Sequence, residues 1–162
     1  MWGRNKKAVL EAGARAPSFR LKNLDGVMVS LDELLSRGPA LLAFYKISCP
    51  VCQLTFPYLE RLAGGSGIQI VGISQDDIAA TQGFNRHFGI TFPTLLDQAS
   101  ESYPASNAFG ITNVPTLFLV EPDGHIASAV SGFSKRDLEA LAKRAGVVPF
   151  RADETVPEWK AG

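Results

Sequence analysis

The sequence predicts an α/β fold, a three-layer sandwich in which a central mixed sheet is flanked by helices. Apolar, strand-like runs alternate with helix-like segments along most of the chain, which favours a sheet covered by helices. One run, residues 68–73, is rich in β-branched residues, as is typical of a buried strand. Near the end, residues 121–124 form a strong turn signal between two further runs, so a hairpin and a helix close the fold.

The first part of the chain predicts a small β-hairpin and a short helix. Residues 1–16 form a polar lead-in of weak helical character, residues 17–21 alternate like a strand, and residues 27–29 follow as a second strand. Ser30 can cap a helix that runs through Leu35, with two acidic residues in its first turn. We therefore expect an N-terminal hairpin extension of the central fold.

The middle of the chain predicts a strand and a helix on either side of the two cysteines, followed by an inserted strand and helix. Residues 41–45 form the first strand, and residues 53–62 carry the apolar stripe of the helix. The inserted unit consists of the strand at 68–73 and a helix that ends at Gly89. The acidic pair Asp76-Asp77 is interpreted as a cap of that helix, in preference to an acid/base or metal role.

The last part of the chain predicts the closing hairpin. A short apolar segment lies at residues 91–96, and a helix at residues 101–109 is interrupted by Pro104. Residues 114–120 and 125–131 form two antiparallel strands around the turn. The final helix follows, with Ser134 as its N-cap.

Length and composition allow one sizeable hydrophobic core. The predicted domain spans residues 17–149, between the lead-in and a tail at residues 150–162. The tail has no periodicity, so we expect it to be ordered only where it docks on the domain. The 16 basic and 16 acidic residues balance without blocks of like charge, which gives no support for nucleic-acid or membrane-surface binding. No apolar run is long enough to span a bilayer. The lead-in lacks the apolar region of a signal peptide, so we expect a cytoplasmic protein, or an extracytoplasmic one if a leader was removed.

The chemistry centres on the two cysteines, Cys49 and Cys52, at the junction between strand and helix. Spacing of three on a first helical turn places both side chains on one face, within reach of a disulfide. The unpaired N–H groups and the dipole of the helix start favour a thiolate at Cys49, and Pro50 suits the first helical position. Cys52, one turn further, is expected to be more buried and to act as the resolving thiol.

The alternative interpretation of an isolated Cys-x-x-Cys is half a zinc site or two buried thiols. Zinc needs about four ligands, and only His87 and His125 remain, each isolated in the sequence. His87 is interpreted as a partly buried packing residue and His125 as an exposed turn residue. The redox interpretation is favoured, with no metal and no cofactor other than a Cys49–Cys52 disulfide.

The strand, the Cys-x-x-Cys helix and the later Val114-Pro115-Thr116 at the start of a hairpin together resemble the thioredoxin superfold. The inserted unit at residues 68–89 and the sequence of residues 114–124 are similar to the ResA/TlpA-like branch of thiol-disulfide oxidoreductases, which are redoxins related to the AhpC/TSA proteins. This resemblance covers residues 16–146. It implies that Pro115 is cis and faces the cysteines, and that the Val114 backbone pairs with the bound substrate.

The sequence also departs from these families at the site. Ser48 replaces the tryptophan that thioredoxins carry before the first cysteine, and Ala43 replaces their buried aspartate. Thr55 stands where ResA-like proteins have a glutamate. Because neither familiar carboxylate is present, water, Thr55, Tyr45 or the departing thiolate must accept the Cys52 proton, or the resolving step is slow.

Two other neighbours of the cysteines are relevant to their reactivity. Lys46 lies just before the active-site loop and can add positive potential near Cys49, although a lysine at a strand end is more often simply solvated. Pro50 and Val51 lie between the cysteines and tune their potential in a direction that the residues do not determine.

Two enzyme classes compete for this sequence. The first is a thiol-disulfide oxidoreductase acting on protein or small-molecule disulfides, with an upstream thiol reductant or oxidant as partner. The second is a peroxiredoxin-like thiol peroxidase, which the resemblance also admits. Peroxiredoxins need a Pro-x-x-x-Thr-x-x-Cys loop, and here Lys46 stands where the threonine would precede Cys49. The oxidoreductase is therefore preferred, and a non-enzymatic adaptor or zinc module is a third alternative.

Overall fold

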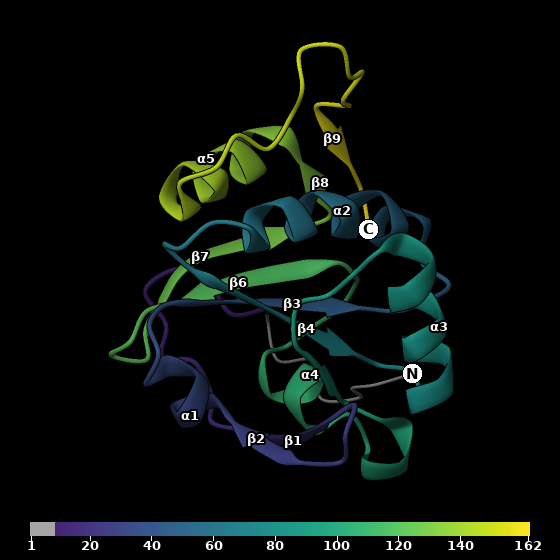
Figure 1. The fold of residues 1–162 in the computed structure, drawn as a ribbon. Coiled ribbons are helices and arrows are strands. Elements are labelled where there is room, and N and C mark those ends of the chain that lie inside the picture. Colours follow the sequence, from purple (N-terminus) through teal and green to yellow (C-terminus); the bar gives the residue numbers. More distant parts are fainter. Residues whose placement is uncertain (1–8) are drawn as a thin grey trace.

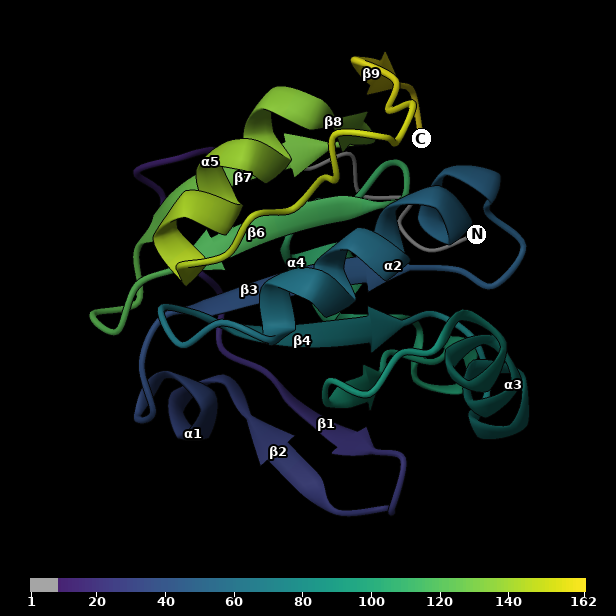
Figure 2. The same ribbon diagram turned by 45° about the horizontal axis from the view of Figure 1, so that its top comes forward.

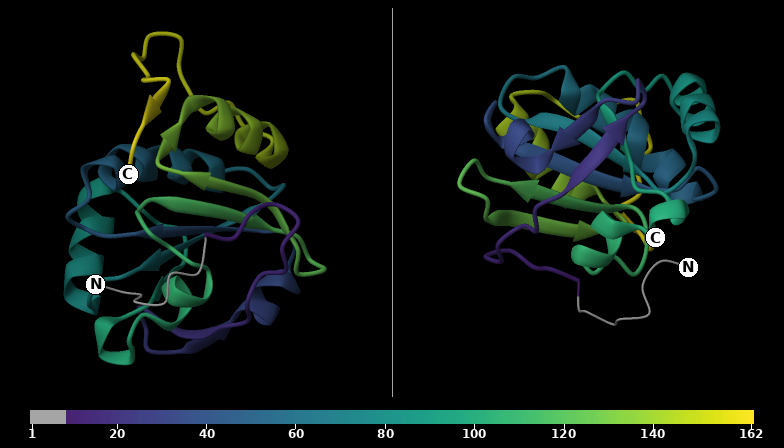
Figure 3. Two further views of the ribbon diagram at one scale, coloured as in Figure 1. Left: turned by 180° about the vertical axis from the view of Figure 1, so that it is seen from behind. Right: turned by 90° about the horizontal axis from the view of Figure 1, so that it is seen from below.

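A seven-stranded mixed sheet divides the molecule into layers (Figure 1). The computed structural model describes residues 9–162. From one edge to the other, the strands are β2 (Met28–Ser30), β1 (Arg20–Asn23), β5 (Thr94–Leu96), β4 (Gln69–Ser74), β3 (Ala40–Tyr45), β6 (Thr116–Val120) and β7 (Ile126–Ser131). The neighbours β3, β4 and β5 are parallel, whereas β6 is antiparallel to β3. The mixed sheet, the N-terminal hairpin and the inserted βα unit are confirmed, and the two hairpins lie at opposite edges (Figure 3).

Helices cover both faces of the sheet. The helix α2 packs against both α3 and α5 on one face (Figure 2), whereas α4 lies on the other. The helical segments are α1 (Leu31–Leu35), α2 (Pro50–Ala63), α3 (Ile78–Phe88), the 3-10 turn η1 (Ala99–Glu101), α4 (Pro104–Ala108) and α5 (Lys135–Ala145). No helix within residues 9–162 is both long and apolar enough to cross a membrane.

Two neighbouring aromatic residues of β3 pack against helical segments on opposite faces of the sheet. Successive side chains of a strand point to opposite faces. The Tyr45 ring packs on Phe56 of α2 with 4.1 Å between ring centroids, whereas the Phe44 ring packs on Phe109 after α4 with 5.3 Å. The helix that carries the cysteines is therefore held directly on the strand that precedes them.

The predicted helix boundaries depend on local capping, and the structure confirms several of them. Ser30 and Glu33 form a capping box at the start of α1. The side chain of Ser134 accepts a hydrogen bond from the Asp137 N–H at the start of α5. Gly89 ends α3 in the left-handed conformation, which glycine adopts without steric cost.

Other predicted boundaries were wrong. The first strand begins at Arg20, three residues later than predicted, and Pro17 could not have donated to a strand ladder in any case. The helix predicted at residues 101–109 is instead the turn η1 followed by α4, because Pro104 suits the first position of a helix and therefore starts one. Of the lead-in, residues 1–8 lie outside the described residues, and residues 9–16 contain no helix.

The tail predicted to depend on docking does dock, and it also contains a strand. Here β9 (Trp159–Lys160) pairs antiparallel with β8 (Phe133–Ser134) as a separate two-stranded sheet beside α5 (Figure 2). A two-residue strand has no periodicity in the sequence, so nothing in the sequence pattern predicts it.

Candidate active site

The two cysteines lie at the start of α2, where Cys49 is the N-cap and Pro50 is the first helical residue. Both thiols are free, Cys49 is half-buried and Cys52 is fully buried. The Cys49 sulfur accepts a hydrogen bond from the Cys52 N–H at 3.1 Å. The predicted difference in accessibility is therefore present, and only Cys49 can be approached from solvent.

Contacts at the helix start lower the pKa of Cys49 to about 6. The hydrogen bond from the Cys52 thiol is the largest cause, and the N–H groups of Cys52 and Val51 and the positive charge of Lys46 add to it against the opposing effect of burial. At neutral pH this sulfur is mainly a thiolate, which is the nucleophilic form.

The surroundings of Cys52 act in the opposite direction. Burial raises the pKa of Cys52, and its hydrogen bond to Cys49 and the negative charges of Cys49 and Asp76 raise it further. The backbone of Lys46 also hydrogen-bonds this thiol and partly offsets the effect. Cys52 therefore holds its proton while Cys49 is ionised, which assigns the two thiols different chemistry.

A pair of side chains holds the loop that leads into the cysteines. The N–H of Ile47 donates to Asp76 Oδ2 at 2.8 Å, and the Ile47 carbonyl oxygen accepts from Gln53 Nε2 at 3.0 Å. The expectation that both acidic residues cap α3 is wrong, because only Asp77 does so, accepting from the Ala80 N–H. Asp76 lies at the end of β4 beside β3 and binds the loop instead, so it is a site residue that the sequence pattern missed.

The residues expected to take a proton from Cys52 make other contacts. The Tyr45 hydroxyl donates to Asn85 Oδ1 at 2.8 Å, and burial raises the pKa of this phenol. The Thr55 hydroxyl donates to the Val51 carbonyl oxygen of its own helix at 2.7 Å. Neither hydroxyl is shown in contact with Cys52 in these hydrogen bonds, and the carboxylate whose charge acts on Cys52 is Asp76.

Residues 114 and 115 complete the site next to Cys49. The Val114–Pro115 peptide bond is cis, as the resemblance implied. The Cys49 sulfur lies 3.4 Å from the Val114 carbonyl oxygen, to which the thiol donates when it is protonated. None of the described residues accepts a hydrogen bond from the Val114 N–H. A backbone donor is thus left for a bound molecule within reach of the reactive sulfur.

The remaining predicted site residues differ in how far they are exposed to solvent. Ser48 and Pro50 are exposed, and Val51 and Lys46 are half-buried beside the cysteines. His125 is exposed as predicted and contacts Asp123, but His87 is exposed as well, so its prediction as a partly buried residue was wrong. Within residues 9–162, no three His, Cys, Asp or Glu side chains come together as metal ligands.

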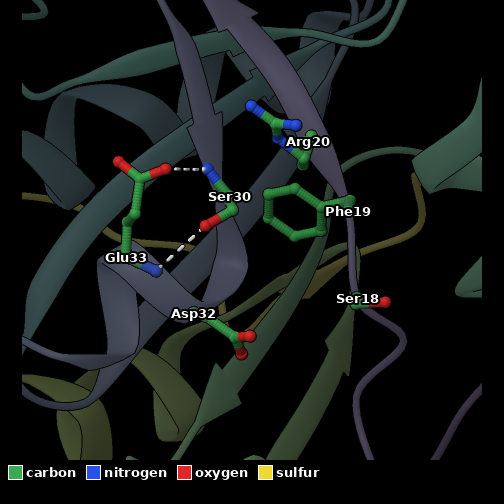
Figure 4. A pocket seen from close by; sticks show the side chains of 6 residues that line it. All are labelled: Ser18, Phe19, Arg20, Ser30, Asp32 and Glu33. Carbon is green, nitrogen blue, oxygen red and sulfur yellow. Dashed lines mark hydrogen bonds between the residues drawn. The ribbon is translucent and has the colours of Figure 1, made fainter.

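A separate pocket of about 600 Å³ lies at the other end of the fold, between β1, β2 and α1 (Figure 4). The Ser30 and Glu33 side chains in it bind each other's backbone as the capping box of α1, and Phe19 forms an apolar side. Neither cysteine lines this pocket. Its polar groups serve the fold, and the chemistry belongs to the start of α2.

Comparison with known proteins agrees with this site. Residues 12–129 match the model of the AhpC/TSA family. The thiol-disulfide oxidoreductase ResA of Halalkalibacterium halodurans is 29% identical over 130 residues, which are 78% of this chain and 72% of that protein. The solved structure of MTB dsbF is 30% identical with a TM-score of 0.66, over 79% of this chain and 92% of that one. The thioredoxin domain of a thiol-disulfide oxidoreductase from Bacteroides vulgatus is 23% identical with a TM-score of 0.74, over 83% and 97%, and supports the fold.

Proposed function

The chain belongs to the AhpC/TSA family and is a ResA-like thiol-disulfide oxidoreductase, and we propose that Cys49 attacks the substrate disulfide while Cys52 resolves the product. The observation that carries this proposal is the contrast between the two thiols. Cys49 is accessible with its pKa lowered to about 6, and the pKa of the buried Cys52 is raised. Contacts that favour a thiolate at one cysteine and a protonated thiol at the other suit an attacking group and a resolving group.

The reaction transfers two electrons to the substrate in two exchange steps. The Cys49 thiolate attacks one sulfur of the substrate disulfide, forms a mixed disulfide and releases the other sulfur as a thiolate. Cys52 then passes its proton to the substrate thiolate released in the first step and attacks the Cys49 sulfur, which forms the Cys49–Cys52 disulfide and releases the second substrate sulfur as a thiolate. Two thiol groups of an upstream reductant return the pair to the reduced state and become a disulfide themselves, and no organic cofactor takes part.

Substrate binding is assigned to the backbone of Val114, next to Pro115. The Val114 carbonyl oxygen lies beside the Cys49 sulfur and its N–H has no acceptor among the described residues, so an extended peptide placed along Val114 would bring its disulfide to the thiolate. Ser48, Pro50 and Val51 then lie next to the bound substrate, and Lys46 supports the thiolate through its charge.

Asp76 is assigned a positioning role in the same proposal. Its carboxylate holds the Ile47 N–H and thereby the loop that leads into Cys49. Its negative charge also disfavours a thiolate at Cys52, and formation of the mixed disulfide removes the separate effect of the Cys49 charge.

The direction of electron flow depends on the compartment in which the protein works. A cytoplasmic location suits a reductase, whereas an extracytoplasmic location suits the maturation of exported cysteines. Disulfide-containing molecules are the substrates in both cases. The reduction potential of the Cys49/Cys52 couple distinguishes the two roles.

The first experiment is a redox titration of the purified protein in glutathione or dithiothreitol buffers, together with turnover of a protein disulfide. A potential near about −270 mV identifies a reductant of the thioredoxin kind, and a potential near about −120 mV identifies an oxidant of the DsbA kind. Failure to form any intramolecular disulfide would overturn the two-cysteine mechanism. If the protein reduced hydrogen peroxide and not disulfides, it would be a thiol peroxidase.

A further inference from the structure

The C-terminal segment is attached to the helix that carries the cysteines. Arg61 of α2 donates to both carboxylate oxygens of Glu154 at 2.7 Å, and this contact is the main reason that the pKa of Glu154 falls to about 2. The Phe150 ring packs edge-on against Tyr58 of α2, with 5.0 Å between ring centroids. Residues 149–154 are therefore fixed on α2 by both charge and aromatic contact.

The last four residues, 159–162, which we name the strap, are held much more lightly. Their strand β9 pairs with β8, and the Lys135 N–H donates to the Glu158 carbonyl oxygen at 3.0 Å just before it. All four strap residues are exposed, and Trp159 is 61% exposed. Because no buried side chain holds the strap, it can leave its place while residues 149–154 stay attached to α2.

The strap ends on the backbone beside the reactive cysteine. A side chain at position 162 would collide with the Val114 carbonyl oxygen and come within 2.9 Å of the Asn113 side-chain nitrogen. The same carbonyl oxygen lies 3.4 Å from the Cys49 sulfur. In Figure 1 this end of the chain accordingly lies beside α2, after the chain has passed over α5. Gly162 therefore covers the backbone group that a peptide substrate would use.

We propose that the strap is a specificity-determining element, which a protein disulfide must displace from Val114 and a small disulfide need not. The inference rests on the proposed function, because it concerns how substrates reach Cys49. A peptide substrate needs an extended path along Val114, whereas a small disulfide needs only the partly exposed sulfur. If the strap covers Val114 nine-tenths of the time, the apparent affinity for protein substrates falls about tenfold.

The test compares the unaltered chain with one that stops after Glu158 and with the Gly162→Ala variant. The added methyl group collides with the Val114 carbonyl oxygen and displaces the strap without shortening the chain. Asp153→Ala is the matched control, because it changes an exposed residue of the same segment outside the strap. For each chain, kcat/KM is measured with a protein disulfide, and the rate of Cys49 with 5,5′-dithiobis(2-nitrobenzoate).

Removal or displacement of the strap is expected to raise kcat/KM for the protein disulfide about tenfold, with the small-disulfide rate and both rates of the control unchanged. If kcat/KM for the protein disulfide is unchanged after truncation, the proposed role of the strap is wrong. If it falls, the proposal is also wrong, because these residues would then help to bind the substrate. If the unaltered chain reacts with neither disulfide, the proposed function fails instead.

A second measurement follows the strap directly. The sequence has two tryptophans, so Trp2→Phe leaves Trp159 as the single reporter. When a protein substrate is trapped on Cys49 in a Cys52→Ser background, the Trp159 emission is expected to shift and its anisotropy to fall. An emission spectrum and anisotropy that stay constant on trapping would show that the strap does not move, and the inference would then fail.

Discussion

At the starts of α2 and α4, backbone N–H groups without helical partners donate to different kinds of acceptor. Both helices have proline at their first positions, and both present backbone N–H groups without helical partners. At α2 the acceptor is the Cys49 sulfur, 3.1 Å from the Cys52 N–H and partly accessible. At α4 it is the carboxylate of Asp97, which is fully buried and accepts from the Ala105 and Ser106 N–H groups at 2.9 and 2.7 Å.

The difference shows how one helix start serves chemistry while the other serves stability. The Asp97 carboxylate keeps its contacts in every redox state, because it takes no part in the reaction. Cys49 loses its negative charge as soon as it forms a disulfide, so the stabilisation at α2 belongs to the reduced protein alone. Contacts that stabilise the thiolate therefore make the couple a stronger oxidant than an unperturbed dithiol would be.

Cys49→Ser and Cys52→Ser give the largest expected effects and test the chemical role of the α2 start. Serine is itself a good N-cap, so Cys49→Ser should leave α2 formed while turnover of protein disulfides falls by at least about a thousandfold, since the nucleophile is lost. Cys52→Ser should accumulate a mixed disulfide on Cys49, detected as an adduct by intact mass spectrometry. Full turnover by Cys52→Ser would contradict the two-thiol mechanism.

Asp97→Ala tests the structural role of the α4 start. Removal of a buried acceptor of two N–H groups is expected to cost about 2–3 kcal/mol in the free energy of unfolding, measured with urea. The matched control is Asp77→Ala, which removes the exposed cap of α3 and should cost about 1 kcal/mol. The alkylation rate of Cys49 should stay unchanged in both. A loss at Asp97 no larger than at Asp77 would show that burial does not distinguish the two acceptors.

Local sequence patterns predict those features of the helix starts and ends that depend on neighbouring residues. The caps at Ser30 and Ser134, the glycine that ends α3 and the placement of Cys49 before Pro50 all depend on contacts within about one helical turn. The mixed sheet follows from the alternation of strand-like runs and helix-like segments, and the opposite faces of Phe44 and Tyr45 follow from the alternation of side chains along a strand. These features make the fold and both cysteines predictable from the sequence.

The missed features depend on contacts between distant parts of the chain. In sequence Asp76 and Asp77 look alike as helix caps, and only the path of β4 beside β3 brings Asp76 to Ile47, 29 residues away. The docking of Glu154 on Arg61 spans 93 residues, and β9 is too short to show a period. Such contacts leave no local signal, because nothing in the sequence around either partner points to the other.

The pH dependence of alkylation measures how strongly the α2 start favours the thiolate. With the pKa of Cys49 at about 6, the rate with iodoacetamide should be half-maximal near pH 6 and fall tenfold per pH unit below it. In the unfolded chain a cysteine thiol has a pKa of about 8.5 and therefore keeps its proton below that pH. The reduced protein should therefore gain stability as pH rises from about 6 to about 8.5 and lose it as pH falls. A midpoint above pH 8 would show that the helix start does not act on this sulfur.

Asp76→Asn gives the smallest expected effect and separates charge from position at the α2 start. Asparagine keeps an oxygen for the Ile47 N–H, so the loop and the Cys49 midpoint should be retained, while the negative charge that raises the pKa of Cys52 is lost. In a Cys49→Ser background, alkylation of Cys52 should therefore become faster, by less than about fivefold, since one partly exposed charge contributes about 1 kcal/mol or less. Asp76→Ala removes charge and contact together, and should in addition shift the Cys49 midpoint by loosening the loop. Equal behaviour of the two variants would assign the whole effect to charge and leave the hydrogen bond to Ile47 without a role in the site.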